Sequence, residues 1–411
     1  MIAEIISIGE ELLIGQTVNT NAAWLSRNLN TVGITVRQIV VIADNHDDIL
    51  NTINQAIQRA DLVLTTGGLG PTRDDITKKA LCELFDSKLV ENQTVMSDNQ
   101  HFFEKRGFEL TELNKLQALV PDKAQIIRNP YGTAPGLWFE HNNTILISMP
   151  GVPFEMQHMM TDGILPALKN RVKEYHIIHR TVLTQGIGES FLAEKISGWE
   201  DQLPEFITLA YLPSPGIVKL RLSGKGPDKE IIEKTIETQV EQLHTIIPEY
   251  IWGYDDQVME ELIGKMLAER SATVCTAESC TGGYISHKLT SVPGSSAYYK
   301  GSVIAYSNQA KQQLLSVDPE ILQTYGAVSQ EVVEVMAKNS LKLFDADYSM
   351  AVSGIAGPSG GTDTKPVGTV WIAVANNQKI VSKVYSFGDT RERNIIRAGI
   401  AAMGMLKELI E

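Results

Sequence analysis

The sequence contains few cysteines: only Cys82, Cys275 and Cys280 occur in 411 residues. Their odd number and the lack of a Cys-x-x-Cys pair argue against a disulfide framework and against a thiolate zinc site. Long apolar runs are also missing, since none approaches the roughly 18–20 residues that a membrane span requires. Residues 1–10 lack a basic stretch and carry Glu4 and Glu10, which is typical of a first β-strand and not of a signal peptide. We therefore expect a cytoplasmic protein with no membrane partner.

Positive charge is scarce as well. The chain has 36 Lys and Arg against 49 Asp and Glu, which gives a formal net charge of −13. A protein that grips nucleic acid through its general surface needs clustered Lys and Arg to neutralise phosphates. The composition therefore argues against a nucleic-acid partner, although a local pocket can still hold a phosphate-bearing small molecule.

The remaining composition is typical of folded domains, with 43% hydrophobic and 21% charged residues. A chain of this length is too long to fold around one hydrophobic core, so two or three domains are expected. We predict an α/β protein in which two separate three-layer α/β domains with mainly parallel sheets are joined by a small α+β domain. The predicted boundaries are 1–171, 172–252 and 257–411.

The first 85 residues alternate strand and helix patterns. Apolar runs at 2–8, 34–41 and 61–66 indicate strands, and helical periodicity follows each of them. This order predicts a parallel sheet with ligands at the carboxyl ends of its strands. Residues 176–250 show a different pattern of strands and helices and contain no catalytic motif. This favours a connecting or dimer-forming role. Residues 250–256 are the predicted linker.

The strongest motif of the first half is Thr66-Gly67-Gly68-Leu69-Gly70-Pro71-Thr72-Arg73-Asp74-Asp75. Its glycines allow backbone N–H groups to approach an anion, and the following helix adds its positive end. Asp74 and Asp75 do not themselves attract phosphate, so we expect them to hold a hard divalent cation that bridges to phosphate oxygens. Glu10 or Glu11 could complete the metal shell. A glycine turn with an acidic helix cap is the alternative interpretation.

The second half contains a comparable strand-to-helix turn, Glu278-Ser279-Cys280-Thr281-Gly282-Gly283. Such turns expose nucleophiles and bind phosphate in α/β proteins. They also occur as simple helix caps with glycines for close packing, and this interpretation stays open for the turn alone. Further motifs follow it: residues 305–308 with Lys311, 353–361, 365–370, and Arg391.

These motifs resemble those of a known family. Residues 8–15, Asn19-Thr20-Asn21, 66–75 and 149–156 are similar to the molybdopterin-binding-type domain that opens CinA-family proteins. The resemblance implies a metal-dependent ADP-ribose pyrophosphatase with a divalent ion of the Mg, Mn or Co type. It implies metal ligation by Glu11, Asp74 and Asp75. The substrate-binding residues that it implies are Asn21, Gly67, Gly68, Gly70 and Thr72.

The motifs of the second half resemble the CinA C-terminal domain, which implies an amidohydrolase of nicotinamide mononucleotide (NMN) in pyridine-nucleotide salvage, with no cofactor. One departure concerns the arginine: Thr390 separates Asp389 from Arg391, where the family pattern has Arg directly after Asp. Arg393 is therefore an alternative to Arg391. The resemblance covers essentially the whole chain, and at family level it implies a homodimer.

Cleavage of a carboxamide requires a nucleophile, a base, an oxyanion site and ligand anchors. Ser279 is our candidate nucleophile, with Cys280 as an alternative. No His lies in these motifs, so Lys311 is the candidate base, as in Ser–Lys variants of the catalytic triad. Tyr306 would relay the proton or orient Lys311, and Glu278 would bind substrate or orient the turn.

The expected oxyanion donors are the backbone amides of Thr281, Gly282 and Gly283, or the Ser353 hydroxyl. Arg391 and the 353–361 loop, including Gly354 and Gly357, would hold the phosphate. The leading hypothesis is a bifunctional enzyme with NMN and ADP-ribose as substrates. A nucleotide-binding sensor or assembly factor and a molybdopterin-handling first domain are the alternatives.

Overall fold

The computed structural model describes residues 1–72, 75–172, 175–388 and 390–411. The chain divides into two compact units, Met1–Ile178 with Gly224–Lys234, and His179–Ser223 with Thr235–Glu411. The three domain boundaries expected from the sequence remain predictions.

The first unit contains a six-stranded sheet with the order β2-β1-β3-β8-β7-β6. Four strands run parallel, and the two at the β6 edge run antiparallel to their neighbours. The predicted mainly parallel sheet is therefore confirmed. In sheet order the strands are β2 (Thr35–Ile42), β1 (Ile2–Ile8), β3 (Leu62–Thr66), β8 (Thr144–Met149), β7 (Gly136–His141) and β6 (Gln125–Ile127).

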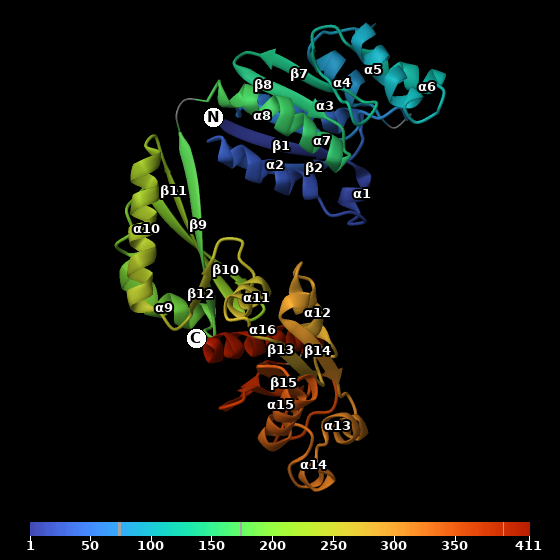
Figure 1. Ribbon diagram of the computed structural model, residues 1–411. Helices are drawn as coiled ribbons and strands as arrows, with labels where there is room; N and C mark the ends of the chain where they lie inside the picture. Colours follow the sequence, from blue (N-terminus) through green and yellow to red (C-terminus); the bar gives the residue numbers. More distant parts are fainter. Residues whose placement is uncertain (73–74, 173–174, 389) are drawn as a thin grey trace. The chain divides into compact units, whose positions relative to one another are not determined.

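Helices cover both faces of this sheet (Figure 1). Successive strand side chains point to opposite faces, so Ile5 enters one core and Ile6 the other. The Ile5 side is covered by α2 (Thr20–Thr31), α7 (Pro153–Met159), the π-helix η2 (Met160–Ile164) and α8 (Leu165–Lys169). The Ile6 side is covered by α3 (His46–Ile57) and α4 (Thr77–Leu84). This is the predicted three-layer arrangement.

Short elements complete this unit. Helix α1 (Glu10–Leu13) follows β1 directly. An insertion between α4 and β6 contains a two-stranded sheet that the sequence reasoning missed, β4 (Leu89–Glu91) with β5 (Leu119–Pro121). Its helices are α5 (Gln93–Glu104), α6 (Glu112–Lys115) and η1 (Leu116–Ala118).

The middle of the chain forms a four-stranded sheet with the order β10-β11-β9-β12. The predicted linker 250–256 is wrong in one respect, because it contains β12 (Ile251–Tyr254), which pairs antiparallel with β9 (His176–Gln185). The other elements are α9 (Glu189–Glu200), β10 (Ile207–Ser214), β11 (Ile217–Gly226) and α10 (Lys229–Ile246). Leu183 and Trp252 join the hydrophobic core of the C-terminal sheet, and Gln185 Nε2 donates to the carbonyl of Ile400 at 2.9 Å.

The C-terminal sheet has the order β14-β13-β15-β16-β17. Its first three strands are parallel and its last two antiparallel. The register between β13 and β14 is irregular, because Val274 pairs with Tyr299 and the next residue, Cys275, pairs with Gly301. In sheet order the strands are β14 (Tyr299–Ile304), β13 (Val274–Glu278), β15 (Tyr348–Gly354), β16 (Thr369–Asn376) and β17 (Ile380–Ser386).

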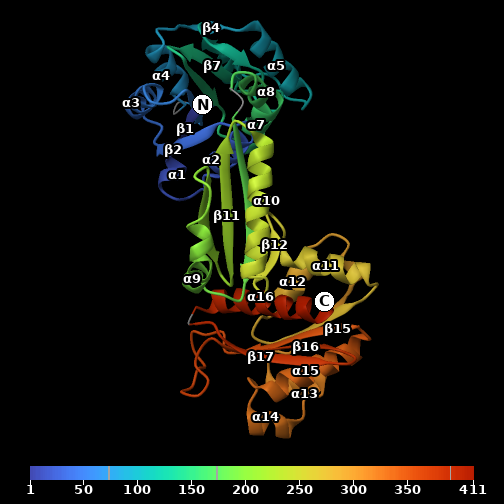
Figure 2. The same ribbon diagram turned by 90° about the vertical axis from the view of Figure 1, so that its left-hand side faces the viewer.

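Figure 2 shows α16 on one side of this sheet and α13, α14 and α15 on the other. Packing with α16 are α11 and α12. The sequence predicts helices at 258–270, 308–315, 329–344 and 391–409, and these are confirmed. It also favours Asn308 as the cap of α13, whereas Ser307 holds that position. None of the helices in the described ranges has the length and apolar character that crossing a membrane requires. The helices are α11 (Met259–Glu269), α12 (Tyr284–Thr290), η3 (Ser295–Ala297), α13 (Asn308–Leu315), α14 (Pro319–Tyr325), α15 (Gln330–Phe344) and α16 (Arg391–Ile410).

Candidate functional sites

Strand β13 places Ser279 at the carboxyl end of the C-terminal sheet. The strand is buried throughout and lies between β14 and β15. The amide of Ser279 still donates to the carbonyl of Val352 on β15 at 2.9 Å, so the serine continues the strand ladder by one residue. The chain then turns through residues 280–283 into α12. Ser279 therefore occupies the edge at which open α/β sheets bind ligands.

Glu278 holds this turn from inside. Its side chain is 0% exposed, and its carboxylate accepts hydrogen bonds from the amides of Gly283 at 3.0 Å, Ile285 at 3.2 Å and Ser286 at 2.8 Å. These amides belong to the start of α12, where unpaired donors and the helix dipole favour a negative charge. The structure thus favours the role of orienting the turn over the predicted role of Glu278 in substrate binding.

Lys311 meets the serine from the neighbouring βα unit. Its ammonium nitrogen lies 2.9 Å from Ser279 Oγ and 2.9 Å from the carbonyl oxygen of Ala305. The side chain is 1% exposed, and burial lowers the pKa of Lys311 below that of an ordinary lysine. A lysine in this state loses its proton more readily and can accept one from a serine hydroxyl. The predicted nucleophile and base are therefore within hydrogen-bond distance of each other.

Cys280, the alternative nucleophile, lies in a different environment. The side chain is buried in the core beneath α12 and α16, and burial raises the pKa of its thiol to about 12. Because the thiolate is the reactive form, a raised pKa makes the thiol inert at neutral pH. The geometry favours Ser279.

The turn also offers hydrogen-bond donors beside Ser279. The amide of Gly282 donates to the carbonyl of Ser279 at 3.1 Å and the amide of Gly283 donates to Glu278, so two of the three amides predicted as oxyanion donors are occupied. Within the described residues, the amide of Thr281 forms no hydrogen bond, and the amide of Cys280 interacts only with its own thiol. The buried hydroxyl of Thr281 also lacks a partner there. Thr281 is the predicted residue that remains available, and Cys280 contributes an amide that the sequence reasoning did not consider.

Tyr306 and Arg391 form a second pair at this edge. Tyr306 is 60% exposed, and its hydroxyl accepts a hydrogen bond from Arg391 Nη2 at 2.9 Å, while Arg391 Nη1 donates to the carbonyl of Gly357 at 2.9 Å. Among the described residues, no hydrogen bond joins Tyr306 to Lys311 or Ser279. The predicted relay through Tyr306 is therefore not seen. Arg393, the alternative arginine, is exposed and has no such contact in the described chain.

The 353–361 loop follows β15, with Gly354 at the strand end and Gly357 beside Arg391. The buried hydroxyl of Ser353 donates to the carbonyl of Ala327 at 2.6 Å, so its proton is already used inside the fold. Sequence reasoning missed Asn394, whose buried amide group donates to the carbonyls of Ala356 and Gly388 at 3.0 and 2.9 Å. Its position one turn after Arg391 was the available signal.

In the first unit, the glycine turn lies where β1, β3 and β8 end. The amide of Gly67 donates to the carbonyl of Met149 at 3.0 Å, and its φ of 109° is unfavourable for other residues. A Cβ at this position would lie 2.1 Å from the carbonyl oxygen of Ile8, so only glycine fits. Gly68 and Gly70 complete the turn. The predicted ligand-binding edge of this sheet is therefore built as a close-packed backbone loop.

Asp75 closes this loop. Its carboxylate accepts hydrogen bonds from the amides of Gly70 and Thr72, both at 2.8 Å, and from the Thr72 hydroxyl. Thr72, predicted to contact phosphate, is therefore held by Asp75. Asp74, predicted as a metal ligand, lies outside the described residues.

Glu11, the remaining predicted metal ligand, is exposed and folds back beside Gly9. A Cβ on Gly9 would lie 2.5 Å from its Oε1 atom. No group of three or more His, Cys, Asp or Glu side chains suited to a metal occurs among the described residues. Mg²⁺ commonly binds proteins through one or two carboxylates together with waters and substrate phosphates. Exposed Glu11 beside the phosphate-type loop fits that mode of binding better than a complete protein cage.

Asn21 lies next to the same loop, in the first turn of α2. Its Nδ2 atom donates to the carbonyl of Gly151 at 2.7 Å, whereas its buried Oδ1 atom has no partner among the described residues. A Cβ on Gly151 would lie 3.4 Å from Gly67 Cα, so Asn21, Gly151 and the glycine turn are neighbours. This arrangement places Asn21 near the predicted ligand site.

Two residues just after the glycine motif escaped the sequence reasoning. The Thr77 hydroxyl lies under Gly68, 2.1 Å from where a Cβ would be. Lys78 is half-buried and donates to the backbone carbonyl and Oε1 of Gln117 at 3.1 and 3.0 Å, and burial lowers its pKa to about 8. Lys78 thereby ties α4 to the insertion at η1.

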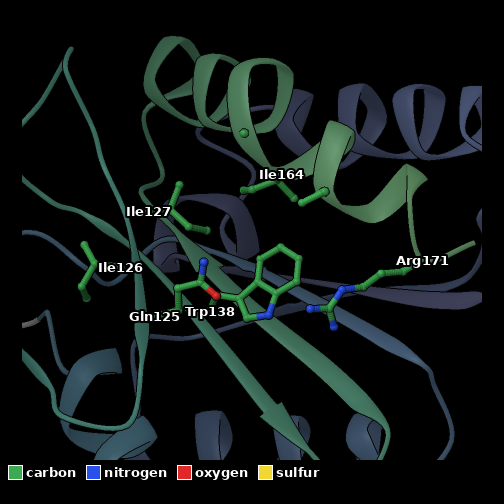
Figure 3. A pocket seen from close by; sticks show the side chains of 8 residues that line it. Gln125, Ile126, Ile127, Trp138, Ile164 and Arg171 are labelled. Carbon is green, nitrogen blue, oxygen red and sulfur yellow. The ribbon is translucent and has the colours of Figure 1, made fainter.

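A cavity of about 250 Å³ lies elsewhere on this unit (Figure 3). Trp138 forms its floor, with Arg171 over the ring at 5.4 Å and paired with Glu140 at 2.7 Å. None of the predicted site residues lines this cavity. Its remaining lining comes from β6 and from the π-helix η2 to α8 segment.

Comparison with known proteins covers the whole chain. Family models match at residues 4–170 ("Probable molybdopterin binding domain"), 179–253 ("Damage-inducible protein CinA KH domain") and 256–410 ("CinA C-terminal domain"). The KH domain is an assignment that sequence reasoning had not reached.

Relatives match over the same length. A CinA-like protein from Cytophaga hutchinsonii is 46% identical over 409 residues, covering 100% of this chain and 98% of the relative. A CinA-like protein from Flavobacterium psychrophilum is 44% identical over 416 residues, covering 100% of this chain and 99% of the relative.

Solved structures match in part. A competence/damage inducible protein from Agrobacterium tumefaciens is 36% identical with a TM-score of 0.37, covering 37% of this chain and 94% of that chain. A competence damage-inducible protein from Klebsiella pneumoniae is 35% identical with a TM-score of 0.36, covering 36% and 93%. From the full-length relatives and the three family models together, the chain belongs to the CinA family.

Proposed function

We propose that residues 257–411 hydrolyse the carboxamide of NMN to nicotinate mononucleotide and ammonia. The observation that carries this proposal is the 2.9 Å contact between Lys311 Nζ and Ser279 Oγ, made at the carboxyl edge of the sheet by a buried lysine with a lowered pKa. A serine hydroxyl needs an adjacent base to act as a nucleophile, and Lys311 supplies one.

In the proposed reaction, neutral Lys311 takes the proton of the Ser279 hydroxyl as Oγ bonds to the carboxamide carbon. The amides of Cys280 and Thr281 donate to the oxygen that becomes negative. The Lys311 ammonium then protonates the amide nitrogen, the C–N bond breaks and ammonia leaves. Water attacks the resulting ester with Lys311 again as base, which releases the carboxylate and restores the serine.

The phosphate of the nucleotide is assigned to Arg391 and the 353–361 loop. Arg391 already donates to Tyr306 and Gly357, so its guanidinium is held in place before substrate arrives. A guanidinium suits phosphate because its donors form paired, charge-assisted bonds. Tyr306 then acts in orienting Arg391, and no cofactor is assigned to this domain.

For residues 1–170 we propose hydrolysis of ADP-ribose to AMP and ribose 5-phosphate. The support is the loop around Gly67 and Gly68 at the strand ends, with exposed Glu11 beside it. A divalent ion held by the carboxylates of Glu11 and Asp74 would neutralise charge on the diphosphate. Asp75 shapes the loop by accepting hydrogen bonds from Gly70 and Thr72.

The experiment is incubation of the purified chain with NMN and with ADP-ribose, each with a divalent metal and with a chelator. We expect ammonia from NMN in both conditions, and AMP from ADP-ribose only with metal. Failure to release ammonia would overturn the first assignment. Equal ADP-ribose hydrolysis in chelator would overturn the metal assignment, and no AMP in either condition would overturn the pyrophosphatase.

A second candidate concerns the first domain alone. The family model that matches residues 4–170 is described as a molybdopterin binding domain, which favours a pterin ligand as the alternative. Competition distinguishes the two, because a site built for a pterin would bind a molybdopterin-type ligand that ADP-ribose and AMP displace only poorly. A sensor without turnover is less favoured, since Ser279 and Lys311 lie together. A homodimer remains a proposal, which sedimentation of the purified chain tests.

A further inference from the structure

Three aromatic rings gather beside the glycine turn of the first unit. Tyr131 belongs to the loop between β6 and β7, whereas Phe154 and His158 lie on α7. The ring centres of Phe154 and His158 are 4.2 Å apart, those of Tyr131 and His158 are 4.2 Å apart, and those of Tyr131 and Phe154 are 5.1 Å apart. Phe154 is nevertheless 56% exposed and Tyr131 is 40% exposed. The rings therefore form a cluster that presents aromatic surface to solvent.

This aromatic cluster lies near the predicted phosphate loop. Gly151 approaches Gly67 so closely that a Cβ on Gly151 would lie 3.4 Å from Gly67 Cα. Phe154 follows Gly151 by three residues, and three residues of extended chain span at most about 11 Å. One small molecule can therefore extend from the glycine turn towards Phe154.

The cluster is held in place by buried polar contacts. Asn129 Nδ2 donates to Glu155 Oε2 at 2.7 Å and to the carbonyl of Ala134 at 2.9 Å, while Asn129 Oδ1 accepts from the amide of Tyr131 at 3.2 Å. One amide side chain thus fixes the Tyr131 backbone to the residue that follows Phe154. Gly132 leaves room for this contact, because a Cβ there would lie 2.1 Å from Glu155 Oε2.

An unpartnered polar atom belongs to Asn21, the residue bonded to Gly151. Asn21 is 8% exposed, and its Oδ1 atom is buried with no hydrogen-bond partner among the described residues. Its Nδ2 atom is bonded to the carbonyl of Gly151, the residue that contacts Gly67. A buried acceptor without a partner costs free energy unless a ligand supplies a donor. The unpartnered Oδ1 atom of Asn21 therefore indicates a ligand with a hydroxyl or N–H group.

We infer that the Tyr131–Phe154–His158 cluster is a nucleobase-binding platform, on which the purine of a nucleotide stacks while its phosphates lie at the Gly67–Gly68 turn. The side-chain Oδ1 atom of Asn21 accepts a hydrogen bond from the ribose that joins the purine to the phosphates. This inference rests on the proposed ADP-ribose pyrophosphatase, and it assigns the AMP half of that substrate to α7. A purine is the occupant that combines a flat aromatic face with a phosphate chain.

The two halves of ADP-ribose provide the test, because only AMP carries a base. Binding of AMP and of ribose 5-phosphate is measured by calorimetry for wild type, F154L and F154W of the full-length chain. F191L, which removes another exposed phenylalanine, from α9, is the matched control. We expect F154L to weaken AMP binding by about tenfold, since stacking on one ring contributes about that factor. F154W and F191L should bind AMP as wild type does.

Ribose 5-phosphate affinity should be equal in all four proteins. Unchanged AMP affinity in F154L, an equal loss for ribose 5-phosphate, or no AMP binding by wild type would each overturn the inference. Should F154L unfold, as circular dichroism would reveal, Y131L replaces it with the same expected loss. If AMP binds to the wild type and more weakly to F154L, but the wild type does not cleave ADP-ribose, the pyrophosphatase alone is refuted. Cleavage with AMP affinity independent of Phe154 would refute the platform alone.

Discussion

Lys311 Nζ lies 2.9 Å from Ser279 Oγ although 32 positions separate the two residues in the sequence. Each follows its own strand, since Ser279 comes directly after β13 and Lys311 lies in the first half of α13 after β14. Because β13 and β14 are parallel neighbours, their carboxyl ends meet at one edge. The pairing of nucleophile and base is thus a consequence of the sheet order.

Replacing Ser279 by Ala removes the proposed nucleophile. We expect the kcat for ammonia release from NMN to fall by about a thousandfold or more, as when a member of a catalytic set is lost. ADP-ribose hydrolysis should be unchanged. Cys280→Ala is the matched control and should keep activity within about tenfold, because the raised pKa keeps its thiol unreactive. A larger loss in C280A than in S279A would reverse the assignment.

The proposed role of Lys311 as the base predicts that kcat/KM for NMN depends on pH. Only the neutral amine can accept the serine proton, so kcat/KM for NMN should rise with pH as Lys311 loses its proton, below the pH at which an ordinary lysine titrates. Lys311→Arg should be inactive, because arginine stays protonated. A wild-type profile that is flat from mildly acidic to mildly alkaline buffer would contradict this role.

The free energy of unfolding should also depend on the protonation of Lys311. The folded-state pKa of Lys311 is lowered, so between it and the unfolded value the unfolded chain binds more protons. The free energy of unfolding therefore rises with pH across that window. Lys311→Met should lack this increment in urea unfolding at paired pH values, with wild type as the reference. An identical pH trend in both proteins would contradict the prediction.

Arg391 and Arg393 separate two interpretations of the phosphate anchor. Arg391→Ala should raise the KM for NMN by about tenfold or more, since a charge-assisted contact is lost. Arg393→Ala, two residues away and exposed, should leave KM unchanged. Steady-state kinetics on NMN decides between them. The opposite pattern would move the anchor to Arg393.

Glu278→Gln tests the carboxylate inside the turn. Glutamine has one acceptor oxygen where glutamate has two, so the amides of Gly283, Ile285 and Ser286 are no longer all satisfied. We expect a loss of about 2 kcal/mol in the free energy of unfolding. Glu320→Gln, at the exposed start of α14, should change it by less than about 0.5 kcal/mol. Equal effects in urea titrations would refute the anchoring role.

Glu11 and Glu10 are adjacent exposed carboxylates, and only Glu11 is assigned to the metal. Glu11→Gln should lower metal-dependent ADP-ribose hydrolysis by at least about tenfold and raise the metal concentration needed for half-maximal rate. Glu10→Gln should behave as wild type. A loss confined to E10Q would exchange the two assignments.

Much of the fold could be predicted because its signals are local. The sequence favours Asp44 or Asn45 as the cap of α3 and Ser329 as the cap of α15, since a side-chain oxygen before an apolar periodic run is a strong start signal. Asn45 and Ser329 hold these positions. The sequence does not reveal strand β12, because four residues between polar turns carry too little periodicity. Its strand character comes from pairing with β9, which is a distant contact.

The candidate site was predictable to a similar degree. The order of the motifs predicts that Ser279 and Lys311 lie close together, because the carboxyl ends of parallel strands share an edge of the sheet. The structure places them in contact. The direction of a side chain is decided by its packing, so the sequence could not show that Tyr306 contacts Arg391, or that Glu278 turns inward to α12. Asn21 and Phe154 likewise became neighbours of one loop only through contacts between distant segments.

The irregular register between β13 and β14 has a consequence for the alignment of the dyad. Val274 pairs with Tyr299 but Cys275 pairs with Gly301, so Lys300 is an extra residue at the far end of the sheet from Ser279. Deleting Lys300 would therefore leave the pairs from Cys275–Gly301 to Glu278–Ile304 in register, with the amide of Ala305 still donating to the carbonyl of Glu278. The spacing of nucleophile and base is thus set by the four regular pairs next to them, and the irregularity is confined to the far end of the strand.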